Sequence, residues 1–105
     1  MKSYKDEMPE TWYRASRCCR ALGSPAAYLV LRTIGAERLA PSELAEKTGL
    51  SIAAASRALH DLRNLDMVRY VTKGKNKEYW LKDPGLLDIL GLIESFVDRA
   101  RSTEI

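Results

Sequence analysis

The sequence predicts a mainly α-helical domain of about five helices with one small β-hairpin. Through most of the chain, apolar residues recur at spacings of three and four, the period of helices that bury one face. Around residues 67–82 the pattern changes to short alternating runs rich in β-branched and aromatic residues, which favour strands. A chain of 105 residues suffices for one compact domain and is too short for two. We therefore expect a single domain over residues 1–105.

The composition is that of a globular protein, with 46% hydrophobic and 30% charged residues. No apolar run approaches the ~20 residues of a membrane span, and the start does not resemble a signal peptide. The two cysteines, Cys18 and Cys19, are neighbours that project about 100° apart in a helix, so an easy mutual disulfide is excluded. We expect a cytoplasmic protein without a membrane partner.

The first two helices are predicted from their apolar faces and their caps. Residues 1–10 are expected to be frayed, with Pro9 at a helix start. The first helix covers about residues 8–22, where one face carries Met8, Trp12, Ala15, Cys19 and Leu22. On another face lie Arg14, Arg17 and Arg20, which we interpret as a solvated stripe rather than as a binding surface. Ser24 and Pro25 then open a second helix, apolar on most sides and hence central in the core.

Residues 42–65 predict two short helices joined by a tight turn. Pro41 opens the first helix, and Gly49 ends it because glycine adopts the left-handed conformation easily. Ser51 caps the second helix, whose buried face carries Ala55, Leu59 and Leu62. The opposite face displays small, polar and cationic residues: Ala53, Arg57, His60 and Asn64. This pattern is typical of a helix-turn-helix, whose second helix enters the major groove of DNA.

The helix-turn-helix is followed by a basic hairpin, predicted at residues 67–82. Residues 67–72 and 78–81 read as strands, and residues 73–77 as a tip with three lysines. Gly74 and Asn76 are expected to supply positive φ angles there. A basic hairpin directly after a helix-turn-helix is a wing, so the motif becomes a winged helix-turn-helix.

Positive charge is concentrated on this part of the chain. The net charge is +3, but residues 51–82 alone carry +4, because seven basic side chains outnumber three acidic ones. A phosphate-binding surface requires such a concentration, although a solvated basic face remains an alternative. We predict double-stranded DNA as the partner and these residues as its contacts: Ser51, Ala53, Ala54, Ser56, Arg57, His60, Arg63, Lys73, Lys75, Asn76 and Lys77.

The last helix, at about residues 84–101, is apolar over more than one stripe. One side can cover the protein's own domain, and a second copy of the chain is the economical cover for the other. A two-fold dimer would place the two recognition helices, the second helix of each helix-turn-helix, about 34 Å apart, which is one turn of DNA. The alternative is a helix that folds back on its own core. We predict that the first and last helices form the dimer interface, through Trp12, Cys19, Leu86, Leu90, Ile93 and Val97.

Several short motifs resemble the ArsR/SmtB family of winged helix-turn-helix repressors. They are Ala21-Leu22-Gly23-Ser24-Pro25 ahead of Val30-Leu31, Ser42-Glu43-Leu44-Ala45 with Gly49-Leu50-Ser51, Ser56-Arg57, and Val68-Arg69 with the Lys/Gly wing. The similarity covers roughly residues 15–100. It implies a homodimeric repressor of transcription that binds palindromic operator DNA and releases it on binding a metal ion or another signal. The identity of an inducer stays open.

The sequence departs from the family at its usual metal sites. Residues 40–42, where the thiol motif would fall, contain no cysteine. The last helix offers Asp88, Glu94 and Asp98 but no histidine, and transition metals prefer imidazole or thiolate ligands. We therefore predict no metal and no cofactor. At residues 52–54 an Ile-Ala-Ala run replaces more polar residues, which leaves direct base readout to Ser56, Arg57 and His60.

Two other functions remain as alternatives. Cys18 and Cys19 could sense arsenite, a soft metal or an oxidant, although a buried free cysteine is usually only a small apolar side chain. The domain could also be a winged-helix module for protein interaction, with its basic face incidental. An enzyme is not expected, because no nucleophile with a base and no phosphate-binding glycine loop is present.

Overall fold

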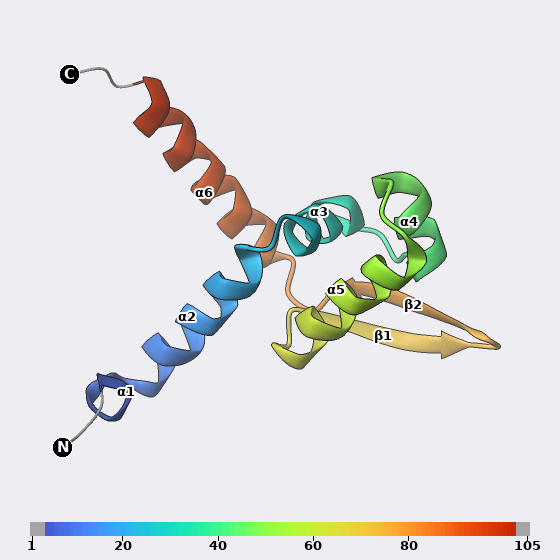
Figure 1. The fold of residues 1–105 in the computed structure, drawn as a ribbon, viewed down its shortest axis with the longest axis horizontal. Coiled ribbons are helices and arrows are strands. Elements are labelled where there is room, and N and C mark those ends of the chain that lie inside the picture. The colour runs from blue at the N-terminus through green and yellow to red at the C-terminus, as the bar shows by residue number, and fades with distance from the viewer. Residues whose placement is uncertain (1–3, 103–105) are drawn as a thin grey trace.

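The computed structural model describes residues 4–102 as six helices and a two-stranded antiparallel hairpin (Figure 1). The helices α3, α4 and α5 pack together beside the hairpin, while α2 and α6 extend away from this body as two arms (Figure 1). The fold class predicted from the sequence is confirmed. In chain order the elements are α1 (Tyr4–Glu7), α2 (Glu10–Leu22), α3 (Pro25–Ile34), α4 (Pro41–Thr48), α5 (Ile52–Asn64), β1 (Val68–Lys73), β2 (Asn76–Leu81) and α6 (Gly85–Ser102).

Side-chain caps and glycines set the ends of the central helices. The Ser24 hydroxyl accepts a hydrogen bond from the Ala27 amide at the start of α3, at 3.3 Å. The Ser51 hydroxyl does the same for Ala54 at the start of α5, at 3.0 Å. Gly49 ends α4 with φ of 82°, in the left-handed region. Because each signal acts within a few residues, the sequence alone locates these three boundaries.

The N-terminal segment differs from the prediction. Residues 1–10 were expected to be frayed, yet Tyr4–Glu7 forms the single turn α1; residues 1–3 lie outside the described residues. Met8 was expected in the first helix, but α2 begins only at Glu10, after an extended Pro9. The proline ring disfavours a helical conformation for the residue before it, which separates the two helices at Met8.

The hairpin is longer and its tip shorter than expected. Lys73 pairs with Asn76, so only Gly74 and Lys75 form the turn. Gly74 has φ of 61°, but the predicted positive φ at Asn76 is wrong, since this residue belongs to β2. A positive φ outside glycine is found instead at Asp66, at 59°, in the turn between α5 and β1.

The core lies between α3, α4, α5 and the hairpin. Its completely buried larger side chains are Val30, Leu31, Ile34, Leu44, Leu59, Leu62, Val68 and Leu90. An additional bridge joins the loop before α4 to the sheet, because Leu39 exchanges backbone hydrogen bonds with Tyr79 at 3.0 and 2.8 Å. None of the residues of α2 is buried, and α6 contributes one fully buried residue. Both arms therefore leave most of their surface outside the core.

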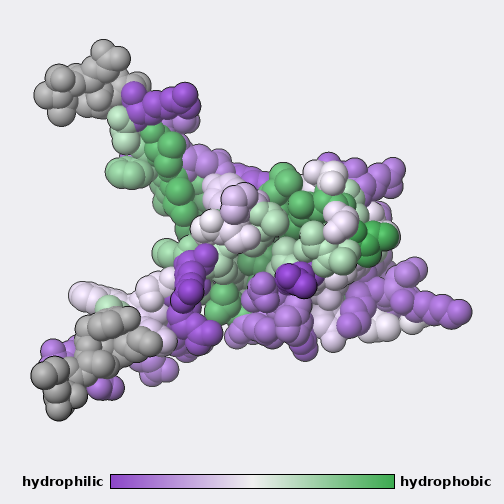
Figure 2. Space-filling model, viewed as in Figure 1, coloured by the Kyte–Doolittle hydropathy of each residue, from purple (hydrophilic) through white to green (hydrophobic). Residues whose placement is uncertain are grey.

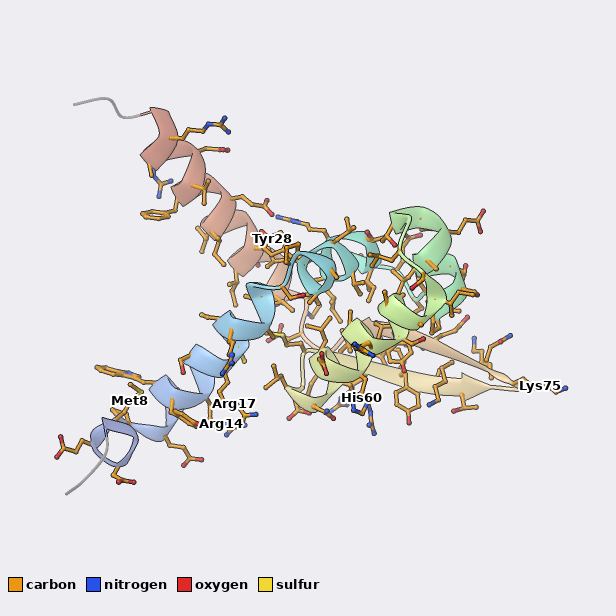
Figure 3. The ribbon with its side chains drawn as sticks, in the orientation of Figure 1. Met8, Arg14, Arg17, Tyr28, His60 and Lys75 are labelled. Carbon is orange, nitrogen blue, oxygen red and sulfur yellow. The ribbon has the colours of Figure 1, made fainter. Side chains whose placement is uncertain are left out.

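A polar cluster fixes α6 against α3. Glu94 accepts hydrogen bonds from the Tyr28 hydroxyl at 2.5 Å and from Arg32 Nε at 2.8 Å, and it forms an ion pair with Arg32 Nη2. The Arg32 guanidinium is the main cause that holds the pKa of Glu94 below its usual value, while the bond to Glu94 raises the pKa of Tyr28. Tyr28 lies where α3 meets the base of α6 (Figure 3). This cluster sets the direction in which α6 leaves the domain.

Candidate nucleic-acid interface

The exposed face of α5 carries the residues from which DNA contacts were predicted. Ala53, Ser56, Arg57 and His60 are exposed, whereas Ala55, Ala58, Leu59 and Leu62 on the opposite face are buried. Within residues 4–102, the structure gives Arg57 no salt bridge. A guanidinium without an internal partner can bind a base edge or a phosphate without first breaking an ion pair.

Three of the predicted contact residues have internal roles. Ser51 caps α5, so its hydroxyl oxygen is already an acceptor. Ala54 is half-buried and supplies the amide that this oxygen binds. His60 Nε2 lies 3.3 Å from the side-chain nitrogen of Asn64, four residues further along α5. If the Asn64 amide donates, His60 keeps its proton on Nδ1, and that N–H can donate to a base or a phosphate.

The hairpin lysines are not equivalent. Lys73 Nζ lies 3.1 Å from Glu78 Oε1, which neutralises part of its charge. Lys77 Nζ lies 4.6 Å from the centre of the Tyr70 ring, and the Arg63 guanidinium lies 4.8 Å from the same centre. Lys75 is exposed in the two-residue turn and reaches furthest from the body of the domain (Figure 3). Among the predicted lysines, Lys75 is therefore the one best placed to bind a phosphate of the DNA backbone.

Sequence reasoning missed part of this surface. A hollow between the end of α5 and β1 is lined by Arg63, Asn64, Arg69 and Tyr70, among others. The exposed position of Arg69 follows from the alternation along the strand, since its neighbour Val68 is buried. The Arg38 guanidinium, from the loop before α4, lies 4.2 Å from the centre of the Trp80 ring. No local pattern in the sequence indicates that contact.

The polar surface is continuous over several elements. In Figure 2 hydrophilic residues extend from α2 past α5 to the hairpin, and hydrophobic residues gather along α6. The hydrophilic surface of α2, α5 and the hairpin is thus visible from one side of the molecule. Within residues 4–102 no helix has the length and apolar character needed to cross a membrane.

The residues predicted for dimerisation lie on both arms, with one correction. Trp12, Cys19, Ile93 and Val97 are exposed, and Leu86 is half-buried. Leu90 is completely buried in the core, so its prediction as an interface residue is wrong: it holds α6 on its own domain. Leu92 and Phe96, which the predicted interface does not include, are 70% and 63% exposed on the same helix.

The two cysteines line one cavity. Cys18 is half-buried and Cys19 exposed, and both border a hollow of about 460 Å³ between α2, the α5–β1 turn and the start of α6. Its walls include Leu22, Leu65 and Leu86. Among the residues described, no three His, Cys, Asp or Glu side chains gather into a metal-binding group. Sensing by this thiol pair stays a prediction.

The fold and this surface define a class. A helix-turn-helix whose second helix exposes an arginine, followed by a lysine-tipped hairpin, is a winged helix-turn-helix, a fold that many DNA-binding regulators of transcription share. A sequence profile described as the MarR family matches residues 24–77, just over half of the chain. The chain therefore belongs to the MarR family. Members of this family are regulators rather than enzymes, as the sequence predicts.

Solved structures resemble most of the domain. NolR from Sinorhizobium fredii is 26% identical, with a TM-score of 0.75 over 91% of this chain and 93% of that one. The homodimeric winged helix-turn-helix DNA-binding domain Mb0332 from Mycobacterium bovis, a possible ArsR-family regulator, is 18% identical, with a TM-score of 0.77 over 94% and 90%. Reduced HlyU from Vibrio cholerae is 21% identical, with a TM-score of 0.73 over 86% and 95%. No curated protein sequence matches the chain.

Proposed function

We propose that this protein represses transcription by binding palindromic operator DNA as a homodimer. The observation that carries the proposal is the exposed face of α5 beside the basic hairpin, with Arg57 free of any salt bridge to the residues described. Each protomer would place α5 in a major groove and the hairpin against the adjacent backbone. A regulator must share a compartment with its DNA, so the cytoplasmic location expected from the sequence is part of the proposal.

The apolar face of α6 supports the homodimer. Ile89, Leu92, Ile93, Phe96 and Val97 expose large apolar side chains along one helix, a patch that marks an interaction surface. Trp12 adds an exposed indole on the other arm. The Mycobacterium bovis domain of the same fold is homodimeric. Pairing through α2 and α6 would bury these side chains and leave both α5 helices open to DNA.

The roles of the contact residues differ with their position. Ser56 and Arg57, with His60 alongside, face outward from α5 and would read base edges or bind phosphates in the groove. Lys75 at the turn, with Lys77, would bind the backbone and supply affinity more than specificity. Lys73 would contribute less, because Glu78 already pairs with it.

The test is a selection of bound duplexes from a random pool, followed by binding of single variants. We expect an enriched palindrome whose half-sites lie about 10 base pairs apart, centre to centre. Arg57→Ala should weaken binding of that duplex by about 1–3 kcal/mol if Arg57 makes a bidentate base contact. Glu46→Ala, on the exposed side of α4, is the control for an exposed helix substitution.

Other outcomes separate the alternatives. If no duplex is enriched, the domain is a protein-interaction module and the DNA proposal fails. If the selected site lies in a promoter and added protein raises its transcription in vitro, the protein is an activator and not a repressor. Repeating the binding measurement with arsenite, zinc and an oxidant tests whether a reagent that reacts with the thiols of Cys18 and Cys19 releases the DNA.

A further inference from the structure

A stripe of three arginines on α2 is not used by the proposed contacts of α5 and the hairpin. Arg14, Arg17 and Arg20 follow one another at intervals of three residues, so they share one side of the helix. All three are exposed, and within residues 4–102 the structure gives none of them a salt bridge. We call these three residues the arginine stripe.

The arginine stripe borders the exposed end of α5. One hollow is lined by Arg17 and Arg20 of α2 together with Asp61 and Asn64 of α5. A second hollow is lined by Arg14 and Arg17 together with Asn64. Figure 3 shows Arg14 and Arg17 on the side of α2 that is nearer to α5. The two hollows share Arg17 and Asn64, so they form one groove between α2 and the end of α5.

This groove continues to the centre of the exposed face of α5. A third hollow, lined by Ser24, Ala53, Arg57 and Asp61 among others, shares Asp61 with the first. A surface path therefore runs from Arg14 to Arg57 without crossing the hairpin. A molecule bound along α5 can extend directly onto the arginine stripe.

The charge of the groove suits a polyanion. Three guanidinium groups face two carboxylates, Asp61 and Asp66. Asp66 is partly neutralised, because Lys82 Nζ lies 3.7 Å from its Oδ1. Guanidinium groups donate two parallel hydrogen bonds to a phosphate and are weakly hydrated, so they are the cations best suited to a nucleic-acid backbone.

The position of α2 in the fold determines which part of the DNA the arginine stripe can reach. The arms α2 and α6 lie on one side of α5, and the hairpin turn points away on the other (Figure 1). In a dimer paired through the arms, the hairpins lie at the outer ends and the arginine stripes lie near the two-fold axis. When two recognition helices occupy successive major grooves, the minor groove between them faces the protein on that axis.

We propose that the arginine stripe binds the phosphates that border this central minor groove, between the two half-sites. The contact rests on the function proposed above and adds to it a second phosphate-binding surface on each protomer. It revises the interpretation of these arginines as a merely solvated stripe. It also predicts that the two half-sites have a required spacing, because the stripes meet the backbone only at one separation.

The test measures binding of the selected duplex as a function of salt concentration. The double variant Arg14→Ala/Arg17→Ala should reduce the magnitude of the slope of log affinity against log salt by about 3.6 for a dimer, since each of the four phosphates that are no longer neutralised contributes about 0.9. Arg101→Ala, which removes an exposed cation at the far end of α6, is the matched control and should leave the slope unchanged. Thermal unfolding of each variant checks the fold.

A second measurement locates the contact on the DNA. Uncharged methylphosphonates replace either the phosphates of the central minor groove or those outside the half-sites. Central replacement should weaken the wild-type protein at least tenfold and weaken the double variant much less, because only Arg20 of the stripe remains to contact those phosphates. An unchanged salt slope, or equal sensitivity of both proteins to central replacement, would overturn the inference while the proposed function stands. Absence of duplex binding by the wild type would overturn the proposed function itself.

Discussion

Truncation of Phe96 tests the homodimer most directly, because this ring is large and lies outside the protomer core. It is 63% exposed. A phenylalanine presents about 200 Å² of surface, so about 125 Å² of Phe96 is free for a partner. Replacement by alanine removes about 100 Å² of it, worth about 2.5 kcal/mol at about 25 cal/mol per Å². Two copies in a two-fold interface give about 5 kcal/mol when burial is complete.

With partial burial we expect Phe96→Ala to weaken dimerisation by about 2–5 kcal/mol, which is roughly 30- to 4000-fold in the dissociation constant. Sedimentation equilibrium over a range of concentrations measures that constant. Val71→Ala is the control, because Val71 is an exposed apolar side chain on the hairpin, away from both arms. A change no larger than that of Val71→Ala would refute the pairing through α6. A fall in the melting temperature of the dilute monomer would show instead that Phe96 stabilises its own protomer.

Three further predictions concern the hairpin, the polar cluster of Tyr28, Arg32 and Glu94, and the core. Lys75→Ala should weaken binding of all duplexes alike and reduce the magnitude of the slope of log affinity against log salt by about 1 for each phosphate that Lys75 binds. Fluorescence anisotropy with specific and random DNA measures both effects. A loss of affinity for the specific duplex alone would contradict the assignment of Lys75 to the DNA backbone. Because Arg32 lowers the pKa of Glu94, the ionised carboxylate stabilises the folded state at neutral pH and this contribution disappears as the pH falls through the lowered pKa. The melting temperature of Glu94→Gln should therefore lie below that of the wild type at pH 7 and approach it under acid conditions; a difference independent of pH would refute the role of the charge. Leu90→Ala should lower the free energy of unfolding in urea by about 2–5 kcal/mol, and a decrease no larger than that of exposed Val71→Ala would place Leu90 outside the core.

The parts of the fold that sequence reasoning located are those set by local chemistry. Ser24 and Ser51 cap helices through bonds three residues along the chain, and Gly49 ends a helix through its own φ angle. The buried face of α5 follows from the helical period alone, since Ala55 and Leu59 lie on one side and Arg57 on the other. None of these features depends on how distant segments meet.

The errors arise where distant segments meet or where two local rules compete. Leu90 lies on the same apolar helix as Ile93 and Val97, and only the packing of α6 against the core decides which of these side chains is buried. Asn76 is a residue type that tolerates positive φ, but the pairing of Lys73 with Asn76 leaves it in a strand and gives the turn to Gly74. The contact of Arg63 with the Tyr70 ring depends on the path of the α5–β1 turn, which no residue pattern specifies.

In the proposed homodimer, the polar cluster of Tyr28, Arg32 and Glu94 would link the pairing of the protomers to the spacing of the operator half-sites. Leu90 anchors the base of α6, and the bonds from Tyr28 and Arg32 to Glu94 fix its direction further along the helix. The apolar residues that would meet the partner, Leu92 and Phe96, lie on either side of Glu94 in the chain. A change in the direction of α6 would therefore rotate one protomer against the other and alter the distance between the two α5 helices. Because B-DNA offers major grooves on one face only about every 34 Å, even a small rotation would move the two α5 helices away from successive grooves and weaken binding.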